Sequence, residues 1–448
     1  MSHDPYLRLV ANMQPSGVHQ AAWRTPGANR RSFVDLDYYL ELARLAERGG
    51  LDALFFADFA ALQPESGRQP RWTMDPTLLL SAIAATTEHI GLVASISTTL
   101  AEPYHVARVV AMLDHLSRGR AGWNVVTSFD PRSAHNFGLD QLPEKEARYR
   151  RAGEFVEVVD ALWSSWEEGA LALDAEAGTY LDLDLIKAVD HVGEFFRVAG
   201  PLQVPTPPQG RPVVFQAGAS GPGRDLAART ADGVFAAQLT PESARRYRDD
   251  LRARATELGR PAEEIRFFPG VVVVAGETRA EALAKRAALD DLVGSADARL
   301  INLAHFLDLD PRSLRLDASL PPEAWESSSH GAEGFRHSVL SFFEDAGRTV
   351  GDFLREGSLG HRTLLGDPRS IADDFEEWHV TGAADGFVLM FDAQPAGLRD
   401  FVDLVVPELR RRGLVRTGYA EETLAQRLRL PRAGASAARE TVGAGVAR

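Results

Sequence analysis

Short apolar stretches alternate with amphipathic ones along nearly the whole chain. The apolar stretches predict buried strands over residues 7–13, 53–57, 90–97, 120–128, 212–217, 232–237, 265–275 and 385–390. Helical spacing of apolar residues predicts helices over residues 37–48, 76–87, 104–117, 147–166, 241–258, 370–379 and 398–411, and from residue 224 onward. Eight strands that alternate with helices predict a (β/α)8 TIM barrel, an α/β fold whose parallel sheet closes on itself.

Two long segments interrupt this alternation. Residues 167–210 are polar and irregular, and residues 279–356 are helical and loop-rich. Loops of this length usually carry function or oligomer contacts, so we expect both to be insertions over the carboxyl-terminal mouth of the barrel. The expected organisation is a single barrel domain over residues 1–430 and a flexible tail over residues 431–448, which is rich in Ala, Gly and Arg.

The stretch PVVFQAGASGPGRDLAARTAD at residues 212–232 predicts a buried strand, a turn with three glycines, and a helix. Unpaired N–H groups and the positive dipole end of such a helix favour an anion, and Ser220 adds a hydroxyl, so one interpretation is a phosphate cradle. A plain strand-to-helix connection without a ligand is an equally open alternative. A nucleophile elbow is disfavoured because Pro222 stands where its last glycine belongs, and the dinucleotide fingerprint G-x-G-x-x-G is absent.

Polar residues follow several of the predicted strands. Asp58 follows the second strand, Thr98 the third, Ser128 the fourth and Ser220 the fifth. The amide of Asn124 lies inside the fourth strand, where it either lines a site or caps a neighbour, because an unsatisfied buried amide is costly. The carboxyl ends of barrel strands meet at one rim, so this placement favours a ligand with many hydrogen-bonding edges.

Composition excludes several classes of function. The formal net charge of −14 argues against nucleic acid or an anionic membrane as the main partner. The absence of cysteine excludes disulfides, Fe–S clusters and thiol catalysis. The chain shows neither a signal peptide nor an apolar span of about 20 residues, so we expect a cytoplasmic protein.

Common barrel chemistries lack the residues they need. A Schiff-base enzyme requires a lysine inside the barrel, but the only lysines are Lys145, Lys187 and Lys285, and none falls in a predicted strand. The paired strand-end carboxylates of a glycosidase and the clustered ligands of a metal site are also missing, so we expect no metal. Such a barrel is typical of an enzyme whose cofactor performs the chemistry.

Several motifs point to one family. They are GRAGWNVVTS (119–128), HNFGLD (135–140), RYRRAGEFVEVVDALWSSW (148–166), PQGRPVVFQAGAS (208–220) and GAADGFVLM (382–390), together with segments 35–58 and 360–378. These motifs resemble the bacterial luciferase-like flavin-dependent monooxygenases, in the subgroup of nitrilotriacetate monooxygenase component A and dibenzothiophene sulfone monooxygenase. The resemblance extends to about residue 431.

This resemblance implies a two-component flavin-dependent monooxygenase on a (β/α)8 barrel. Such an enzyme receives reduced FMN from a separate NAD(P)H:flavin reductase, and a flavin (hydro)peroxide formed with O2 oxygenates a small organic substrate. The resemblance also implies a homodimer or homotetramer. We expect segment 279–356 to act as a lid that excludes water.

The resemblance also assigns candidate site residues. The flavin-contacting positions of the family fall on Asp58, Thr98, Ser128, Tyr149 and Ser220, and the N–H groups at Gly218 and Ala219 would help Ser220 hold the 5′-phosphate. In sulfone-cleaving relatives, one histidine in the first loop and one in the late insertion are implicated in the reaction. Their counterparts are His19 and His305, unless these are ordinary loop histidines. Trp23 and Phe55 either line the apolar side of the substrate pocket or belong to the core.

Two alternative functions stay open. A deazaflavin-dependent hydride-transfer oxidoreductase on the same barrel would need no O2. A non-catalytic flavin-binding protein would hold oxidised FMN without substrate-dependent oxygen use. Segments 13–16 and 62–71 depart from the subgroup and border the expected substrate cavity, so the resemblance does not carry a substrate to this chain.

Overall fold

Eight parallel strands close into a barrel in the computed structural model, which describes residues 6–62, 64–71, 74–218, 220–294, 300–301, 303–304, 307–326, 333–344, 347–358, 360–428 and 430. These strands are β1 (Arg8–Asn12), β2 (Ala53–Phe56), β3 (Gly91–Ser97), β4 (Ala121–Val126), β7 (Val213–Gln216), β8 (Gly233–Ala236), β9 (Arg266–Ala275) and β12 (Gly386–Phe391). Pairing of β9 with both β8 and β12 closes the ring. All eight predicted strands, and with them the predicted TIM barrel, are confirmed.

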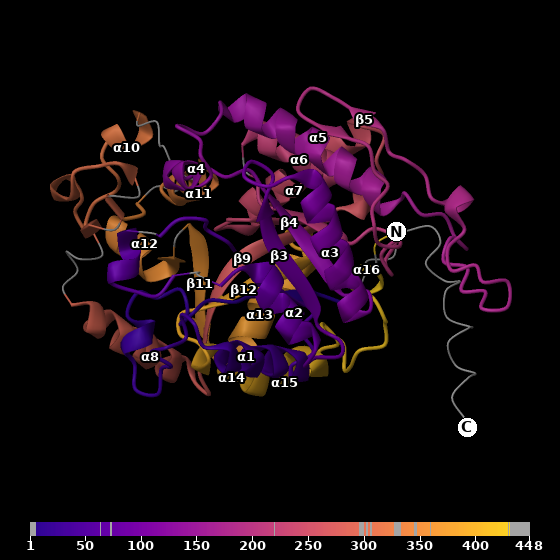
Figure 1. Ribbon diagram of the computed structural model, residues 1–448. Helices are drawn as coiled ribbons and strands as arrows, with labels where there is room; N and C mark the ends of the chain where they lie inside the picture. Colours follow the sequence, from indigo (N-terminus) through magenta and orange to yellow (C-terminus); the bar gives the residue numbers. More distant parts are fainter. Residues whose placement is uncertain are drawn as a thin grey trace.

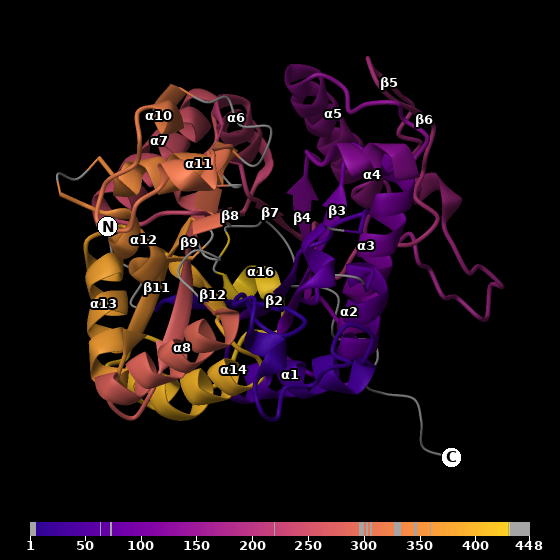
Figure 2. The ribbon, with the colours of Figure 1, turned by 90° about the vertical axis from the view of Figure 1, so that its left-hand side faces the viewer.

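Helices surround the strands, as the view down the barrel axis in Figure 2 shows. The helices that follow successive barrel strands are α1 (Leu36–Arg48), α2 (Pro76–Ala84), α3 (Pro103–Ser117), α5 (Lys145–Trp163), α6 (Gly221–Thr230), α7 (Pro241–Glu257) and α13 (Pro368–Val380). A short α4 (Pro131–Asn136) precedes α5. The last predicted helix is divided into α14 (Ala396–Asp400), a π-helical turn (Phe401–Val405) and α15 (Val406–Arg411).

Local sequence determines where these helices begin. In α2 the Asp75 side chain accepts hydrogen bonds from the backbone N–H groups of Thr77 and Leu78, and Pro76 occupies the first helical position. A carboxylate satisfies N–H groups that the first helical turn leaves unpaired, and proline has no N–H to lose there. The same combination of cap and proline begins α13 at Asp367 and Pro368.

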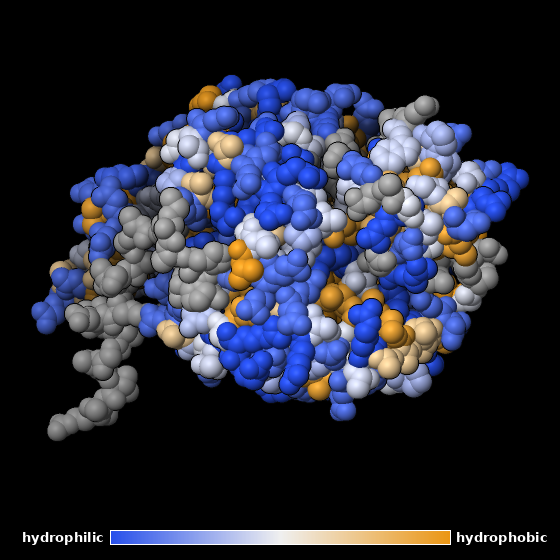
Figure 3. Space-filling view, turned by 180° about the vertical axis from the view of Figure 1, so that it is seen from behind, coloured by the Kyte–Doolittle hydropathy of each residue, from blue (hydrophilic) through white to orange (hydrophobic). Residues whose placement is uncertain are grey.

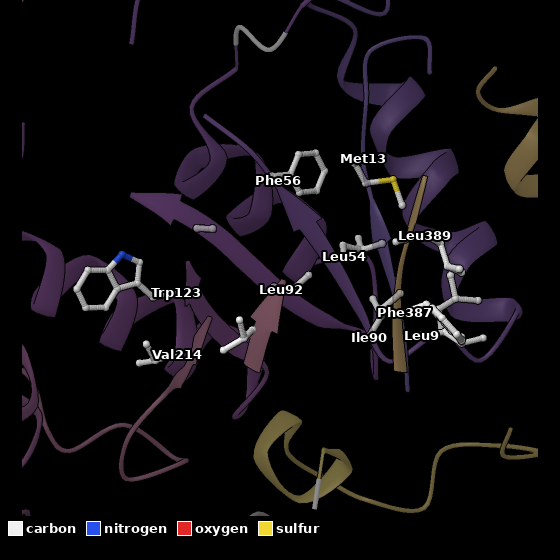
Figure 4. Packing of buried hydrophobic residues seen from close by; sticks show 14 of the residues in the cluster. Leu9, Met13, Leu54, Phe56, Ile90, Leu92, Trp123, Val214, Phe387 and Leu389 are labelled. Carbon is white, nitrogen blue, oxygen red and sulfur yellow. The ribbon is translucent and has the colours of Figure 1, made fainter. Parts of the chain in front are cut away.

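Alternating side chains give each strand two apolar faces. One face packs outward against the helices through residues such as Leu9, Leu54, Leu92 and Leu389, which Figure 4 shows on neighbouring strands. The other face fills the barrel interior with a cluster that includes Val10, Phe55, Val93, Phe215 and Phe268. Full burial of one such side chain contributes about 1.5–3 kcal/mol, so both layers stabilise the barrel.

The amino-terminal end of the barrel is closed by α16 (Leu424–Arg427). Leu424 and Leu428 join the interior cluster, and Figure 2 shows this helix in the middle of the ring of strands. The backbone N–H of Leu424 donates to the carbonyl of Gly119 at 2.9 Å. A Cβ at Gly91 would lie 2.5 Å from Leu424 Cδ1, so the glycine makes room for this plug.

The two excursions lie on opposite sides of the barrel (Figure 1). Residues 167–210 contain the hairpin of β5 (His191–Val192) and β6 (Arg197–Val198) and follow the outer side of α5, where His191 Nε2 lies 3.0 Å from Glu154 Oε1. The late excursion contains α8 (Arg279–Val293), α10 (Glu323–Glu326), α11 (Glu333–Phe342) and α12 (Val350–Glu356) and lies beside the barrel mouth. Its described part has its own apolar cluster, which includes Leu307, Phe343 and Phe353. The tail over residues 431–448 lies outside the described residues.

Besides the two-residue strands β5, β6 and β10 (Gly357–Ser358), one longer strand, β11 (His361–Gly366), was not predicted. After β10, β11 pairs in parallel with the outer half of β9, from Arg362 opposite Val271 to Gly366 opposite Ala275. This half is available because the pairing of β8 with β9 ends at Pro269. The late excursion therefore re-enters the fold at the rim of the barrel.

The surface of the protein is mixed in character. Figure 3 shows the side opposite to Figure 1 as largely hydrophilic, with separate hydrophobic patches. Exposed apolar side chains include Leu183 and Val192 on the early excursion and Val380 at the end of α13. In the part of the chain that the structure describes, no helix is both long and apolar enough to cross a bilayer.

Candidate active site

A cavity of about 280 Å3 opens at the carboxyl ends of the barrel strands. Its walls come from β2, β3, β4, β7 and β8 and the loops that follow them, from the start of α5, and from β11. Of the candidate residues, it brings together Asp58, Ser128, Tyr149, Gly218 and Ser220. The strand ends at which polar residues were predicted thus border one cavity, as expected of a barrel.

The turn between β7 and α6 forms one end of this cavity. Ser220 is the N-cap of α6, and its Oγ accepts a hydrogen bond from the N–H of Gly223 at 3.3 Å. The same Oγ donates to the Tyr149 hydroxyl at 3.4 Å, which joins the turn to α5. A Cβ at Gly218 would lie 2.8 Å from the Cα of Gly223, so two backbone segments approach here closely enough to require glycine. Ala219 lies outside the described residues.

The turn is held in place from behind. Tyr247, on α7, donates a hydrogen bond from its hydroxyl to the carbonyl of Gly218. The guanidinium of Arg224 lies 4.7 Å from the centre of the Tyr247 ring and pairs with Asp250 at 2.9 Å. These contacts fix the backbone of the turn before any ligand binds.

Amides and hydroxyls line the deeper wall of the cavity. The Asn124 side chain donates from Nδ2 to Ser95 Oγ at 2.9 Å, so it both lines the cavity and bonds a neighbour. Its Oδ1 is buried and has no hydrogen-bond partner among the described residues. A buried acceptor that makes no hydrogen bond costs about 1–3 kcal/mol, so this oxygen is available to a donor group of a ligand. Gln216 beside it uses Oε1 to accept from the N–H of Gly218 at 2.6 Å.

Ser128 and Thr98 follow neighbouring strands but occupy different environments. Ser128 lines the cavity, with its Oγ 2.7 Å from Ser97 Oγ. Thr98 is fully buried and donates from Oγ1 to the carbonyl of Val126 at 3.1 Å. Thr98 is not among the described residues that line the cavity. Of the hydroxyl groups expected at the strand ends, that of Thr98 is therefore used in a hydrogen bond within the barrel.

Asp58 lies at the rim after β2, where it lines the cavity and is exposed to solvent. Desolvation at the cavity wall, followed by the nearby charge of Asp75, raises the pKa of Asp58 to about 6. Its carboxyl group can therefore either donate or accept a hydrogen bond within the ordinary pH range.

Three further predicted residues, His19, Trp23 and Phe55, are not among the described residues that line the cavity. His19 uses both ring nitrogens: Nδ1 accepts from the N–H of Ala21 at 3.2 Å, and Nε2 lies 3.2 Å from Asp290 Oδ1 on α8. Trp23 donates from Nε1 to the carbonyl of Arg68 at 2.8 Å. The ring of Phe55 lies in the barrel interior, edge-on to Phe215 and Phe235. His305 lies outside the described residues.

Sequence reasoning missed four charged or titratable residues of the cavity wall, one of which is Asp130, after β4, whose carboxylate pairs with Arg132 at 2.9 Å. Lys145 and Arg148, at the start of α5, line the cavity; the sequence analysis weighs the lysine only as a Schiff-base candidate and places it outside the predicted strands. His361, at the start of β11, also lines it, and burial lowers the pKa of this imidazole to about 3. No sequence spacing could have found His361, because β11 itself was not predicted.

Comparison with known proteins supplies the family. The luciferase-like monooxygenase profile matches residues 15–385. The chain is 43% identical over 447 residues to nitrilotriacetate monooxygenase component A of Aminobacter aminovorans, covering 96% of this chain and 98% of that protein. It is 37% identical over 450 residues to dibenzothiophene-sulfone monooxygenase of Rhodococcus erythropolis (strain XP), covering 96% and 98%.

A solved structure agrees with these sequence matches. Riboflavin lyase, crystallised with modified FMN and riboflavin, is 32% identical, has a TM-score of 0.82, and is matched over 94% of this chain and 95% of its own. The subgroup expected from the sequence motifs is confirmed. With the closed barrel and a polar cavity at its carboxyl end, these matches place the chain in the family of luciferase-like monooxygenases.

Proposed function

We propose that this protein is the oxygenating component of a two-component monooxygenase that uses reduced FMN and O2 on a small organic substrate. The observation that carries the proposal is the glycine turn after β7, where Ser220, Tyr149 and the start of α6 converge on the cavity. The name component A, borne by the nitrilotriacetate relative, supports a separate NAD(P)H:flavin reductase as the source of reduced FMN. We further propose a cytoplasmic homodimer or homotetramer.

The cavity residues fit FMN. The turn offers a hydroxyl and a helix amino terminus to a phosphate, and side chains at Gly218 or Gly223 would intrude on that space. Lys145 and Arg148 also line the cavity, together with the carboxyl groups of Asp58 and Asp130. The amide oxygen of Asn124 offers an acceptor to a ring or ribityl donor. The phosphate end of FMN and the end that carries its hydrogen-bonding groups therefore both have counterparts among the cavity residues.

Bound reduced FMN supplies the two electrons with which one atom of O2 becomes water while the other enters the substrate. The protein's part is to bind, orient and exclude water. Ser220 and Tyr149 would hold the phosphate, and the N–H groups of Gly218 and Ala219 would contribute, that of Gly218 after it leaves Gln216 Oε1. Asp58 and Ser128 would contact the rest of the flavin. Thr98 would support this contact from behind the cavity wall, because its hydroxyl and its backbone N–H both donate to the carbonyl of Val126 and its carbonyl accepts from Arg151.

His19 and His305 are the histidines we propose for proton transfer to or from the substrate. For His19 this role has a structural requirement. Because Nδ1 accepts a backbone N–H, the ring proton lies on Nε2, which must leave Asp290 before it can reach a substrate. We propose that Trp23 and Phe55 shape the apolar side of the substrate pocket, Phe55 from the layer of side chains beneath the cavity.

The test combines oxygen uptake with product analysis. The purified protein receives reduced FMN and air with each of four probes: nitrilotriacetate, dibenzothiophene sulfone, dimethyl sulfide and hexadecane, whose classes match relatives of this chain. The proposal expects an oxygenated product from at least one probe and hydrogen peroxide alone without it. Hydrogen peroxide alone across the panel would contradict it, and anaerobic turnover with a reduced deazaflavin would favour hydride transfer instead.

A further inference from the structure

Two phenylalanine rings meet at the rim of the cavity. Phe59 follows β2 and Phe129 follows β4, and both line the cavity. Their ring centres lie 6.2 Å apart and their planes are at 89°, which is an edge-to-face contact. Phe129 is nevertheless 40% exposed. A large apolar side chain is thus presented to solvent at the wall of a cavity that many polar groups line.

The lengths of three connections explain how these rings meet. β2 and β4 lie on either side of β3 in the sheet, so they do not pair with each other. Residues 57–75 connect β2 to α2, and residues 127–144, which include α4, connect β4 to α5, but only residues 98–102 connect β3 to α3. The two long connections meet across the short one, where Asn136 Nδ2 donates to the carbonyl of Ala60 at 2.8 Å.

The backbone that carries Phe129 is fixed on both sides of this residue. Before it, Ser128 Oγ lies 2.7 Å from Ser97 Oγ. After it, Asp130 is 7% exposed and accepts a hydrogen bond from the N–H of Arg132 as the N-cap of α4. A fixed aromatic ring that stays exposed at a cavity wall offers apolar area to a ligand.

The ring pair extends away from the proposed phosphate turn. That turn follows β7, whereas Phe59 follows β2, and β3 and β4 lie between these two strands. Phe59 and Phe129 directly follow Asp58 and Ser128, the residues proposed to contact the flavin, and so lie one residue further from the strand ends. A substrate that enters a cavity already occupied by the flavin would therefore meet the two rings.

We propose that Phe59 and Phe129 are specificity-determining residues that hold an aromatic ring of the substrate. This inference rests on the proposed monooxygenase function and deepens it by naming the substrate class, a small aromatic compound. A third ring can pack edge-to-face or offset on such a pair, and this contact adds to the burial of apolar area. An aliphatic chain could use the apolar area alone.

The charges on the cavity wall agree with this class. Lys145 and Arg148 line the cavity, but so do the carboxyl groups of Asp58 and Asp130. Two basic and two acidic side chains give no strong preference for a polyanion such as nitrilotriacetate. Contact with the exposed ring of Phe129 is then the feature by which this wall selects its substrate.

The experiment compares Phe129→Ala, Phe129→Leu and Phe59→Leu with the wild type. Phe137→Ala is the matched control, since Phe137, the C-cap residue of α4, is 52% exposed and is not among the described residues that line the cavity. Each protein is checked for its melting temperature and its FMN dissociation constant. Dibenzothiophene sulfone, hexadecane and nitrilotriacetate are then titrated into the FMN-loaded protein, and kcat and KM are measured with reduced FMN.

We expect the wild type to bind dibenzothiophene sulfone more tightly than hexadecane or nitrilotriacetate. Phe129→Ala should weaken this binding and raise KM by about tenfold or more, because apolar area and ring contact are both lost. Phe129→Leu and Phe59→Leu should lose only part of the affinity, since leucine keeps much of the apolar area without the ring contact. Phe137→Ala should match the wild type, and FMN binding should be unchanged in every variant.

Several results would overturn the inference. They are a wild type that binds no dibenzothiophene sulfone or that prefers hexadecane or nitrilotriacetate, and a Phe129→Ala variant that matches Phe137→Ala. Wild-type affinity in Phe129→Leu would exclude the aromatic class, and a loss of FMN affinity in Phe129→Ala equal to that for the sulfone would assign the rings to the flavin. Oxygenation of hexadecane or nitrilotriacetate alone would overturn this inference and support the proposed function, whereas failure of the wild type to bind FMN would refute the proposed function itself.

Discussion

The glycine turn gives the sharpest prediction, the effect of Gly218→Ala on flavin binding. The new Cβ would lie 2.5 Å from Gln216 Nε2 and 2.8 Å from the Cα of Gly223. The Gln216 amide can rotate away, but Gly223 is backbone in the first turn of α6 and cannot. The turn must therefore open, and Ser220 must move relative to the amino terminus of the helix.

The expected magnitude follows from the contacts that this opening disrupts. A hydrogen bond to a charged group contributes about 1.5–3 kcal/mol, which corresponds to about 10- to 150-fold in affinity. Only FMN carries the phosphate, so Gly218→Ala should weaken FMN by this factor and leave riboflavin nearly unchanged. The assay is an anaerobic titration of both reduced flavins, and the quantity that matters is the ratio of their dissociation constants.

Gly221→Ala is the matched control in the same turn. A Cβ at Gly221 would meet nothing within 4 Å, so this variant should keep the wild-type ratio. If Gly218→Ala preserved the preference for FMN over riboflavin, the turn would not be a phosphate cradle. The same conclusion would follow if both variants lost the preference equally, because a general loss of order in the turn would then explain it.

Other parts of the structure lead to three further predictions. Arg120 is 3% exposed and donates to four backbone carbonyls and to Thr87 Oγ1, so Arg120→Ala should lower the free energy of unfolding by about 3 kcal/mol or more in urea titrations, and an unchanged midpoint would contradict this. Because its pKa is raised to about 6, the Asp58 carboxyl is neutral below about pH 6 and anionic above, so FMN should bind more weakly as the pH rises through 6. Asp75→Asn should move the midpoint of this pH dependence lower, and Asp58→Asn should abolish the part of it that Asp58 causes. Identical pH profiles of FMN binding in the wild type and both variants would refute the assignment. Asp290→Asn weakens the contact of Nε2 of His19 with α8, so limited proteolysis within residues 17–26 should become faster, and an unchanged cleavage rate would show that the contact does not hold the loop.

The barrel could be predicted from sequence because its signals are local. Each strand is a short apolar run, and the predicted segment 212–217 differs from β7 (Val213–Gln216) by one residue at each end. Helix caps such as Asp75 and Pro76 are equally local. Hydrophobic burial determines these elements, and the pattern of apolar residues that indicates it lies within one short segment of sequence.

The missed features depend on contacts between distant segments. β11 (His361–Gly366) forms because β9 extends beyond β8, and nothing within HRTLLG indicates that length. The proximity of His361 to Phe235, whose ring centres lie 5.3 Å apart, likewise follows from this pairing. Phe55 and Thr98 follow the same rule: a residue at a strand end can face the cavity or the core, and the barrel geometry that decides between them is not visible in one strand.

The plug at the base of the barrel has a consequence for how the molecule is assembled. Leu424 and Leu428 follow all eight barrel strands in the chain, so they can join the interior cluster only after every strand of the barrel has been synthesised. Once seated, the plug leaves the carboxyl-terminal rim as the route for small molecules. Truncation before Thr423 would thus remove α16 and expose the interior cluster at the end of the barrel opposite to the cavity. Any decrease in turnover would then result from lower stability of the barrel.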